Sequence, residues 1–442
     1  DLTPLAVRFP SALFGSLTVL LVFLFAKQFF KKPTVPLLSA LFLCLSPWHL
    51  QLSRAGFEAN LGLFLVTLGA WLFTKGAKKP LWLILSVIPL GLSMYAYHAN
   101  RVLVPLLGLS FGLLYLKKLL TNKSKSLIAI FLFILISLPL SLRLNTPEVK
   151  QRFLETSAFS DSALVIESNQ LISQDGGGPV SRLIHHRYWF YTKTFLDHYL
   201  DHFNFNYLFI SGDSNPRHST QLVGSLYLIQ LPLLIFGLFS LFKNKKSELI
   251  PILVWIILAP IPAALTKATP HALRSLLLLI PLTILCAYGA VQLIKSKLLI
   301  YIFTIILLFE FSRHQYIYHF NYPKLHQSQW QYGYQELMEY INQNKDKYDT
   351  IYVTRKLGRP SIYYWFYSKT KPSLVQIANN KVNKDQGEYL EFQNIKFELP
   401  KINTYNSNSL IVVAKDDIIN LTNPVKIIKD LNNAEIFKIY EN

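Results

Sequence analysis

The stretch Pro270–Lys297, PHALRSLLLLIPLTILCAYGAVQLIKSK, decides the fold. It opens with a histidine and an arginine, continues as an uncharged apolar run, and closes with two lysines. An apolar run of about 20 residues is long enough for one helix to cross a bilayer. Lysine-rich loops mark the cytoplasmic side of membrane proteins. We therefore expect a membrane helix whose Lys295 end lies inside and whose Arg274 end lies outside.

The same alternation repeats along the chain. Loops that carry only lysine alternate with loops that combine arginine or histidine with other polar residues. The first set holds Lys27, Lys31, Lys32, Lys75, Lys78, Lys79, Lys117, Lys118, Lys123, Lys125, Lys243, Lys245, Lys246, Lys295 and Lys297. The second set consists of the motifs 53–58 (SRAGFE), 97–101 (YHANR), 212–219 (GDSNPRHS) and 270–274 (PHALR). We expect the chemistry to lie with the second set, on the extracytoplasmic face of the plasma (bacterial inner) membrane.

Composition also favours a membrane protein. The 442 residues are 51% hydrophobic and 14% aromatic, and the mean hydropathy is +0.29, which is high for a soluble chain of this length. Much of the net charge of +19 sits in the short lysine loops, so membrane lipid, not nucleic acid, is the expected partner. Cys44 and Cys286 lie within apolar runs, which argues against a disulfide framework or a cysteine metal site.

The expected fold class is an α-helical polytopic membrane protein with a small C-terminal extracytoplasmic α/β domain. We predict ten spans, at approximately 11–30, 35–50, 60–74, 81–97, 102–116, 127–142, 222–242, 249–266, 275–294 and 298–312. Helices 1–6 fall in 1–142 and helices 7–10 in 222–320. Residues 143–221 form an extracytoplasmic loop with an amphipathic, interface-lying helix near 185–203. Residues 321–442 form the α/β domain, with a helix over 329–345 and strands at 351–354, 410–413 and 436–439.

The chain begins with Asp1, and its first residues are expected outside because Lys27 to Lys32 are expected inside. An outside start needs a preceding span or a removed signal peptide. We therefore expect a fragment that lacks an N-terminal helix and loop.

Several chemistries lack their usual signatures. The sequence contains no Walker motif, no Rossmann glycine fingerprint and no HExxH. An enzyme outside the cell can instead take an activated sugar from a polyprenyl phosphate. Such a donor needs cations for its phosphate, an apolar slot for its tail and a carboxylate to deprotonate the acceptor. The candidate phosphate ligands lie at the expected outer ends of the spans: Arg54, Arg101, Arg217, His218, His271 and Arg274.

The motifs also resemble a known family. Residues 8–12 (RFPSA), 46–49 (SPWH) with Arg54 and Glu58, 95–101 (YAYHANR) and 270–274 (PHALR) resemble bacterial superfamily C glycosyltransferases. The closest group is the protein O-mannosyltransferases and aminoarabinose lipid A transferases, and the resemblance spans about 1–312. It implies an inverting transfer from a polyprenyl-phosphate sugar to an acceptor protein, lipid or glycan. It also implies that the main catalytic acid lies in an outer loop upstream of Asp1.

The acids present allow two interpretations each. Glu58 could bind acceptor or metal, or form an ion pair with Arg54 at a spacing of four. Asp213 could be catalytic, or could shape an Asx-type turn. His198 and His202 have the spacing of a two-histidine metal pair, but no third ligand is evident, so we assign no metal ligands and expect a wet amphipathic face. No cofactor is assigned, and dependence on a divalent metal stays open.

The basic candidates could also have purely structural roles. Arg101 could snorkel from a helix end, and Arg217 and His218 could anchor a span at the membrane interface. Arg274 is the strongest candidate for the donor phosphate. The rival functions are a transporter or lipid-linked-sugar flippase, and an adhesion or receptor protein. Transporters place polar residues near the bilayer midplane, whereas these motifs lie at the ends of nearly uncharged spans.

Overall fold

The computed structural model describes residues 3–244, 249–378, 384–385, 387–400, 405–418 and 420–442. Lys245 and Lys246 of the lysine set lie outside the described residues. The chain divides into a helical unit, Arg8–Gln315, and a second unit formed by Asp1–Val7 with Tyr316–Asn442. Each unit is described separately below.

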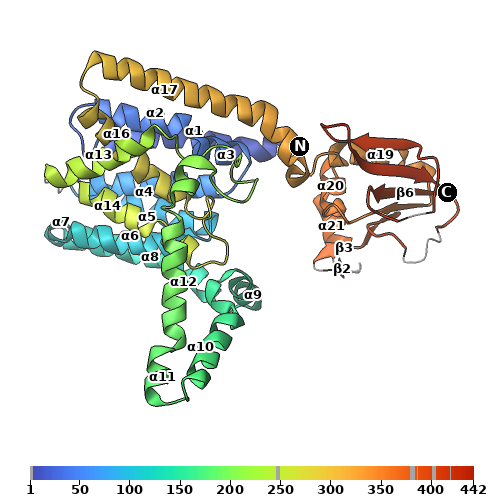
Figure 1. Ribbon diagram of the computed structural model, residues 1–442, viewed down its shortest axis with the longest axis horizontal. Helices are drawn as coiled ribbons and strands as arrows, with labels where there is room; N and C mark the ends of the chain where they lie inside the picture. The colour runs from blue at the N-terminus through green and yellow to red at the C-terminus, as the bar shows by residue number, and fades with distance from the viewer. Residues whose placement is uncertain (1–2, 245–248, 379–383, 386, 401–404, 419) are drawn as a thin grey trace. The chain divides into compact units, whose positions relative to one another are not determined.

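Every predicted apolar segment of the helical unit contains a helix (Figure 1). These helices are α1 (Pro4–Ala26), α2 (Thr34–Leu45), α3 (Pro47–Arg54), α4 (Ala59–Gly76), α5 (Leu81–Ala96), α6 (Asn100–Leu114), α7 (Leu116–Thr121), α8 (Lys123–Leu142), α13 (Gln230–Lys243), α14 (Ile250–Leu258), α15 (Ile261–Ala264), α16 (Leu279–Leu293) and α17 (Lys297–Tyr316). The segment predicted at 222–242 becomes an α-helix only at Gln230.

By length and hydropathy alone, four described helices can cross a membrane: Pro4–Ala26, Lys123–Leu142, Leu276–Leu293 and the continuous run Lys297–Trp330. The pair α2 and α3, bent by 56°, raises this number to five. Several long apolar helices are typical of a multi-pass membrane protein. The count of ten spans stays a prediction. Four further apolar helices have only 10–17 residues, and α4, with 18 residues, is not among the candidate spans.

Two glycines let a pair of these helices pack closely. A Cβ atom on Gly289 of α16 would lie 1.9 Å from the Leu233 carbonyl oxygen of α13. A Cβ atom on Gly237 of α13 would lie 2.5 Å from the Leu285 carbonyl oxygen of α16. Small residues allow such backbone contact between membrane helices. The α16 helix is buried along most of its length, so it forms the centre of the helical unit.

The segment between the two groups of apolar helices projects from them as a helical hairpin (Figure 1). It contains α9 (Pro147–Thr156), η1 (Ala158–Ser160), α10 (Ser162–Gln174), α11 (Pro179–Ile184), α12 (Arg187–Asp201) and the π-helical turn η2 (Asn206–Ile210). The helix predicted near 185–203 is thus present as α12. The Ser168 hydroxyl donates to the His185 carbonyl at 2.5 Å and ties α10 to the start of α12.

The second unit contains a six-stranded sheet in the order β4-β5-β1-β6-β8-β7. Its strands are β1 (Thr350–Val353), β4 (Glu391–Phe392), β5 (Ile395–Lys396), β6 (Ser409–Ala414), β7 (Lys426–Lys429) and β8 (Glu435–Glu441), and β2 (Lys384–Asp385) pairs with β3 (Glu388–Tyr389) separately. β1 is parallel to β5 and β6, whereas β8 is antiparallel to β6. The three predicted strands are present as β1, β6 and β8.

Helices complete this α/β unit. They are η5 (Ile317–Asn321), α18 (Tyr322–His326), η6 (Gln327–Trp330), α19 (Tyr334–Asn344), η7 (Lys345–Lys347), α20 (Pro360–Tyr367) and α21 (Pro372–Ala378). Leu337 and Ile341 lie four residues apart on α19 and pack with Ile351 of β1 in the core. The helix predicted over 329–345 starts later, at Tyr334, because Gly333 takes a φ of 95° that interrupts the helical backbone.

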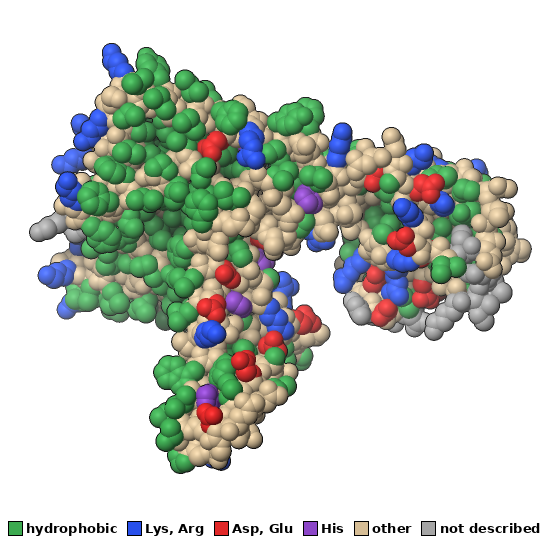
Figure 2. Space-filling view, viewed as in Figure 1, with side chains coloured by type: hydrophobic (Ala, Val, Ile, Leu, Met, Phe, Trp, Pro, Cys, Tyr) green, Lys and Arg blue, Asp and Glu red, His purple; other side chains and the backbone are tan. Residues whose placement is uncertain are grey.

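The lysine-only loops and the mixed motifs lie at opposite ends of the helical unit. We call these the lysine end and the motif end. α1, α4 and α16 each run from the motif end and finish beside lysines, and α5 runs in the opposite direction. Figure 2 shows Lys and Arg side chains gathered along one margin of the helical unit, with apolar side chains covering the helices behind them.

Candidate functional site at the motif end

Three chain segments that are distant in sequence meet at the motif end. The Trp48 indole Nε1 donates to the Ala272 carbonyl at 2.9 Å. The Gln51 amide Nε2 donates to the Arg217 carbonyl at 3.1 Å. Both donors lie on α3, whose first turn is capped by the Ser46 hydroxyl accepting from the His49 N–H. The α3 helix, which begins within the SPWH motif, therefore supports the two later motifs.

Asp213 joins the two later motifs to each other. Its Oδ2 accepts from the Ala272 N–H at 2.7 Å and lies 2.9 Å from Nδ1 of His218. Its Oδ1 accepts from the Asn215 N–H at 2.8 Å. The Asx-type turn is present, and the carboxylate in addition bridges residues 59 positions apart in sequence. Because the side chain is only 3% exposed, Asp213 is a buried anion held by at least three donors.

The pKa of Asp213 reflects these contacts. Burial alone would raise the pKa of this carboxyl. The hydrogen bond and positive charge of His218, with the backbone N–H groups of Asn215 and Ala272, hold it below its usual value. Both carboxylate oxygens are thus engaged, which favours a positioning role for Asp213 over the catalytic one weighed above.

A row of histidines continues from this aspartate. The rings of His218 and His271 lie 4.8 Å apart, centroid to centroid, at an angle of 34°. The His271 N–H donates to Nε2 of His202 at 3.2 Å, and Nδ1 of His202 lies 2.9 Å from the His198 carbonyl. His202 must therefore carry its proton on Nδ1. Burial lowers the pKa of His271 to about 3.

We expected His198 and His202 to lie on a solvent-exposed face of an amphipathic helix. This expectation is wrong for His202. Its side chain is buried and braces the backbone of His271. Because Nδ1 of His202 donates to its own helix and Nε2 accepts from His271, the ring is committed on both sides. His198 lies on α12 and His202 is the C-cap residue of the same helix, but the partner that decides the role of His202 comes from the 270–274 motif.

Arginines gather around His98, beside the histidine row. The pKa of His98 is lowered to about 4, first by burial and then by the positive charges of three guanidinium groups. These belong to Arg152, Arg274 and Arg101. Nε of Arg101 donates to the Met94 carbonyl at 3.1 Å, and Nη1 of Arg274 donates to the Thr266 hydroxyl at 2.7 Å. Three cations close enough to act on one neutral imidazole create a strongly positive region.

Tyr97 borders the same region. Burial raises the pKa of its phenol, while the charges of Arg274 and Arg152 oppose this shift. The acid Glu58 acts on Tyr97 in the opposite sense to the arginines. The tyrosine therefore stays protonated at neutral pH and can donate a hydrogen bond to an oxyanion. Its proximity to Glu58 brings the 53–58 motif close to the 270–274 motif.

The remaining predicted residues lie on the surface of the motif end. Arg54, Glu58 and Arg217 are exposed. Arg54 ends α3, and Gly56 takes a left-handed φ of 77° before α4 begins. The spacing of four between Arg54 and Glu58 therefore does not place them on one helix, because α3 ends at Arg54 and Glu58 precedes α4.

No sequence pattern identified Arg152 as a candidate site residue. It lies on α9, within the polar stretch PEVKQRFLET, and no motif or apolar run marks it. A short antiparallel bridge between Ser157 and Thr266 brings this segment to the 270–274 motif. The Lys267 N–H donates to the Thr156 carbonyl at 2.9 Å and strengthens the same junction. Only the tertiary fold places this third arginine.

One set of side chains could hold a metal ion. Ligand atoms of Asp213, His218 and His271 all lie within 4.8 Å of one another among the described residues. Histidine nitrogen with carboxylate oxygen suits Zn²⁺ and similar divalent ions. The hydrogen bonds at Asp213 already satisfy this set without an ion, so a metal would have to displace the proton shared with His218. The pair His198 and His202 does not contribute to this set.

Comparisons with known proteins bear on the first third of the chain. Residues 2–142, from the start through α8, match the family model described as dolichyl-phosphate-mannose-protein mannosyltransferase. No curated protein matches the chain. Among solved structures, the chain is similar to the oligosaccharyltransferase of Archaeoglobus fulgidus tethered with an acceptor peptide, at 13% identity and a TM-score of 0.43. That alignment covers 88% of this chain and 49% of the other.

Over residues 2–142, the family match confirms the resemblance to the superfamily C glycosyltransferases. It contains the 53–58 and 97–101 motifs and therefore Arg54, Glu58 and Arg101. The motifs around Asp213 and Arg274 lie beyond it. Their relation to the first two rests on the contacts of Trp48, Gln51 and Asp213 described above.

Proposed function

We propose that this protein is a membrane glycosyltransferase that moves a sugar from a polyprenyl-phosphate donor to an extracytoplasmic acceptor, with inversion at the transferred carbon. The acceptor is a protein, a lipid or a glycan. The observation that carries the proposal is the positive region formed by Arg101, Arg152 and Arg274 around His98. It lies at the end of an apolar helical unit whose first part is mannosyltransferase-like.

The chemistry of the donor explains why this arrangement fits. A sugar phosphate leaves as an anion, and fixed cations stabilise the charge that develops on the leaving phosphate. Guanidinium groups hold phosphate oxygens through paired hydrogen bonds. The Tyr97 phenol and the neutral His98 ring add uncharged partners beside them. Arg54 and Arg217, which are exposed, would meet the donor from its outer side.

The acids at the motif end divide between two tasks. Asp213 holds the 270–274 motif in place through Ala272 and is already engaged on both oxygens. Glu58 is exposed and lies close enough to Tyr97 to act on it electrostatically. Of the two acids, Glu58 is therefore the one that can reach a bound acceptor. We assign the donor phosphate to Arg274 and Arg101, with Arg152 as the third cation.

The test uses the full-length protein in lipid nanodiscs with radiolabelled polyprenyl-phosphate sugars. Arg274→Ala and Arg54→Ala should each lower sugar transfer by on the order of 100-fold or more, as loss of a group that stabilises transition-state charge does. Arg187→Ala is the matched control, because Arg187 is exposed on α12 and stacks on Tyr188 instead. Transfer at the wild-type rate by both site variants, with normal membrane insertion, would overturn the assignment.

The orientation needs its own test. Single cysteines at position 32 and at position 217, in a chain with Cys44 and Cys286 replaced, should react differently with an impermeant maleimide on intact cells. We expect labelling at 217 and protection at 32. The reverse pattern would place the motif end in the cytoplasm and exclude an extracytoplasmic acceptor.

A further inference from the structure

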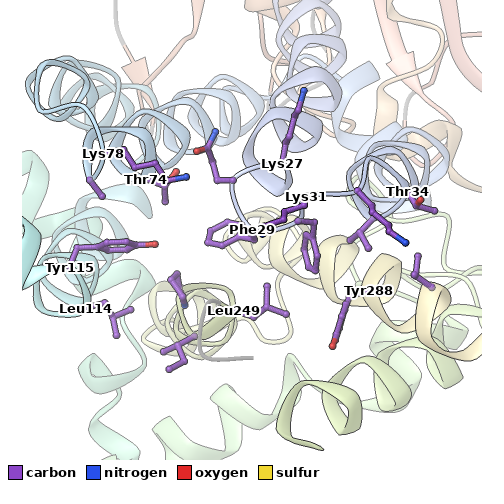
Figure 3. A pocket seen from close by; sticks show the side chains of 18 of the residues that line it. Lys27, Phe29, Lys31, Thr34, Thr74, Lys78, Leu114, Tyr115, Leu249 and Tyr288 are labelled. Carbon is purple, nitrogen blue, oxygen red and sulfur yellow. The ribbon is translucent and has the colours of Figure 1, made fainter. Parts of the chain in front are cut away.

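The lysine end of the helical unit contains a cavity that the proposed reaction does not use. Its volume is about 910 Å³. Figure 3 shows side chains from several helices around it. Its walls come from the turn between α1 and α2, the end of α4, the α6–α7 junction, the start of α14 and the end of α16. It is a meeting point of five parts of the unit.

The described lining of this cavity is cationic. It includes five lysines and no acidic residue: Lys27, Lys31, Lys32, Lys78 and Lys118. No ion pair between described residues involves any of the five. Five like charges that line one concave surface repel each other, and an anion inside would relieve that repulsion. Neutral donors also line the cavity, including Gln28, Thr34 and Gln292.

Helix ends explain only part of this arrangement. A helix C-terminus carries partial negative charge and attracts lysine, and α1 and α4 both end beside the cavity at Ala26 and Gly76. The positive-inside tendency places lysines at this end of the unit, but it does not require their side chains to point toward a common cavity. Lys117, Lys125 and Lys297 satisfy the positive-inside tendency without lining the cavity. The concentration of the other lysines around one hollow is the additional feature.

A second cavity indicates the nature of the anion. An apolar groove of about 630 Å³ lies on the other side of the α6–α7 junction. Leu114, Tyr115 and Lys118 line the cationic cavity, whereas Leu113, Leu116 and Leu119 line the groove. The two cavities are therefore neighbours across one stretch of chain. A molecule with a charged head and a hydrocarbon tail suits this pair of surfaces.

The groove has room for such a tail. It is lined by Gly108 and Gly112 of α6, and a Cβ atom added to either glycine would meet nothing within 4 Å. Its other walls are mainly leucine, isoleucine, valine and phenylalanine side chains of α4 to α8, and Lys123 and Ser126 of α8 also line it. A hydrocarbon chain can pack against these side chains by van der Waals contact, as lipid tails do on membrane helices.

We propose that the cationic cavity binds the phosphate group of an anionic membrane lipid, and that the lipid tail lies in the neighbouring apolar groove. Arg274 and Gln292 are 18 residues apart along η4 (Leu276–Leu278) and α16, which places this site roughly 27 Å from the motif end. It is therefore separate from the donor phosphate site and does not rest on the proposed function. A soluble phosphate carries the same recognised group, so the test includes both sources.

The test measures thermal unfolding of the full-length protein in a neutral detergent during titration with short-chain phosphatidylglycerol. The cavity variant is Lys31→Gln/Lys78→Gln/Lys118→Gln. The control variant, Lys117→Gln/Lys125→Gln/Lys297→Gln, removes the same charge from the same end. Wild type and control should show a saturable rise in the unfolding temperature. The cavity variant should need on the order of 100-fold more lipid, because each lysine near an anionic headgroup contributes about 1 kcal/mol.

Two further additions identify the ligand. Phosphatidylcholine should stabilise far less than phosphatidylglycerol, and inorganic phosphate should have no effect at equal concentration. A cavity-dependent effect of inorganic phosphate would support the phosphate site but overturn the lipid. Equal weakening in the cavity and control variants would overturn the site, because it would indicate a diffuse surface charge.

Two variants guard against a loss of folding. Lys31→Arg/Lys78→Arg/Lys118→Arg keeps the charge and should keep the response. Gly112→Leu fills the groove with a side chain that has space, so it should leave the unfolding temperature without lipid unchanged and weaken the response to phosphatidylglycerol. An unchanged lipid response in Gly112→Leu would exclude the groove from the site.

Discussion

The two ends of the helical unit are both cationic, but they hold their charges in different ways. At the lysine end, ammonium groups line an open cavity and no described carboxylate accompanies them. At the motif end, Arg274, His218 and His271 are partly or fully buried, and hydrogen bonds to backbone and side chains hold Arg101, Arg274 and His218 in place. Flexible point charges suit a mobile anion such as a lipid headgroup, whereas fixed planar donors suit one defined geometry. The difference predicts distinct responses to mutation.

The largest effect is expected from Asp213→Asn. Removing the charge leaves His218 without its buried partner and weakens the bond from the Ala272 N–H. Breaking a buried pair costs about 3–5 kcal/mol. The unfolding temperature of the purified protein should fall, and transfer should fall with it. Asp197→Asn, on an exposed position of α12, is the control, and an equal effect in both variants would contradict the bridging role.

Exchange of cation type should separate the two ends. Arg274→Lys keeps the charge but removes the planar fork, so transfer should fall by roughly 10- to 100-fold. Lys31→Arg at the lysine end should leave transfer within about twofold. The measurement is initial rate at saturating donor. Equal tolerance at both ends would mean that the motif end requires only positive charge.

The pH dependence of stability should arise at the motif end. The pKa of His98 is lowered to about 4 in the folded protein, from about 6.5 in an unfolded chain. Between these values the unfolded chain binds more protons, so stability decreases as the pH falls from about 6.5 to about 4. His98→Gln should flatten this slope, measured as unfolding temperature against pH. The cavity variant at the lysine end should keep the wild-type slope.

Removal of Arg152 should change the pH dependence of stability in a predictable way. Its charge helps to lower the pKa of His98, so Arg152→Gln should raise this pKa. The loss of stability should still begin near pH 6.5, where the unfolded chain titrates, but should end at a higher pH and be smaller in total. Histidine NMR titration measures the pKa directly. No change in the His98 pKa would place Arg152 away from the positive region.

The smallest effect is expected from Trp48→Phe. The variant keeps an aromatic ring but loses the hydrogen bond from Nε1 to the Ala272 carbonyl. The net loss should be about 1 kcal/mol, seen as a small decrease in unfolding temperature with little change in the lipid response at the lysine end. A loss as large as that of Asp213→Asn would mean that α3, and not the aspartate, is the main support of the 270–274 motif.

Sequence patterns predicted where the apolar helices lie along the chain because hydropathy and charge act locally. The lysine loops and mixed motifs are visible without knowledge of any tertiary contact, and the strands at β1, β6 and β8 follow from short apolar runs. Contacts chosen by the fold were not predictable in this way. Arg152 lies in an ordinary polar helix, and His202 looked exposed until the backbone of His271 was placed beside it.

The roles of the acids show the same limit. A turn signature identified the local geometry of Asp213, but its bridge to Ala272 spans 59 positions. The prediction that Arg54 and Glu58 lie on one helix is wrong, because Gly56, with its positive φ, separates α3 from α4. The number of membrane crossings is also set by tertiary packing, because short apolar helices can span only when neighbours cover their ends.

The hydrogen bond between Trp48 and Ala272 has a consequence for biosynthesis. Its partners are 224 positions apart, and a ribosome adds about 5–20 residues per second. Trp48 therefore emerges roughly 10–45 s before Ala272 exists. During that interval α3 and the nascent 53–58 motif have no 270–274 motif to dock against. Until the ninth predicted span arrives, the Trp48 indole therefore lacks its native acceptor.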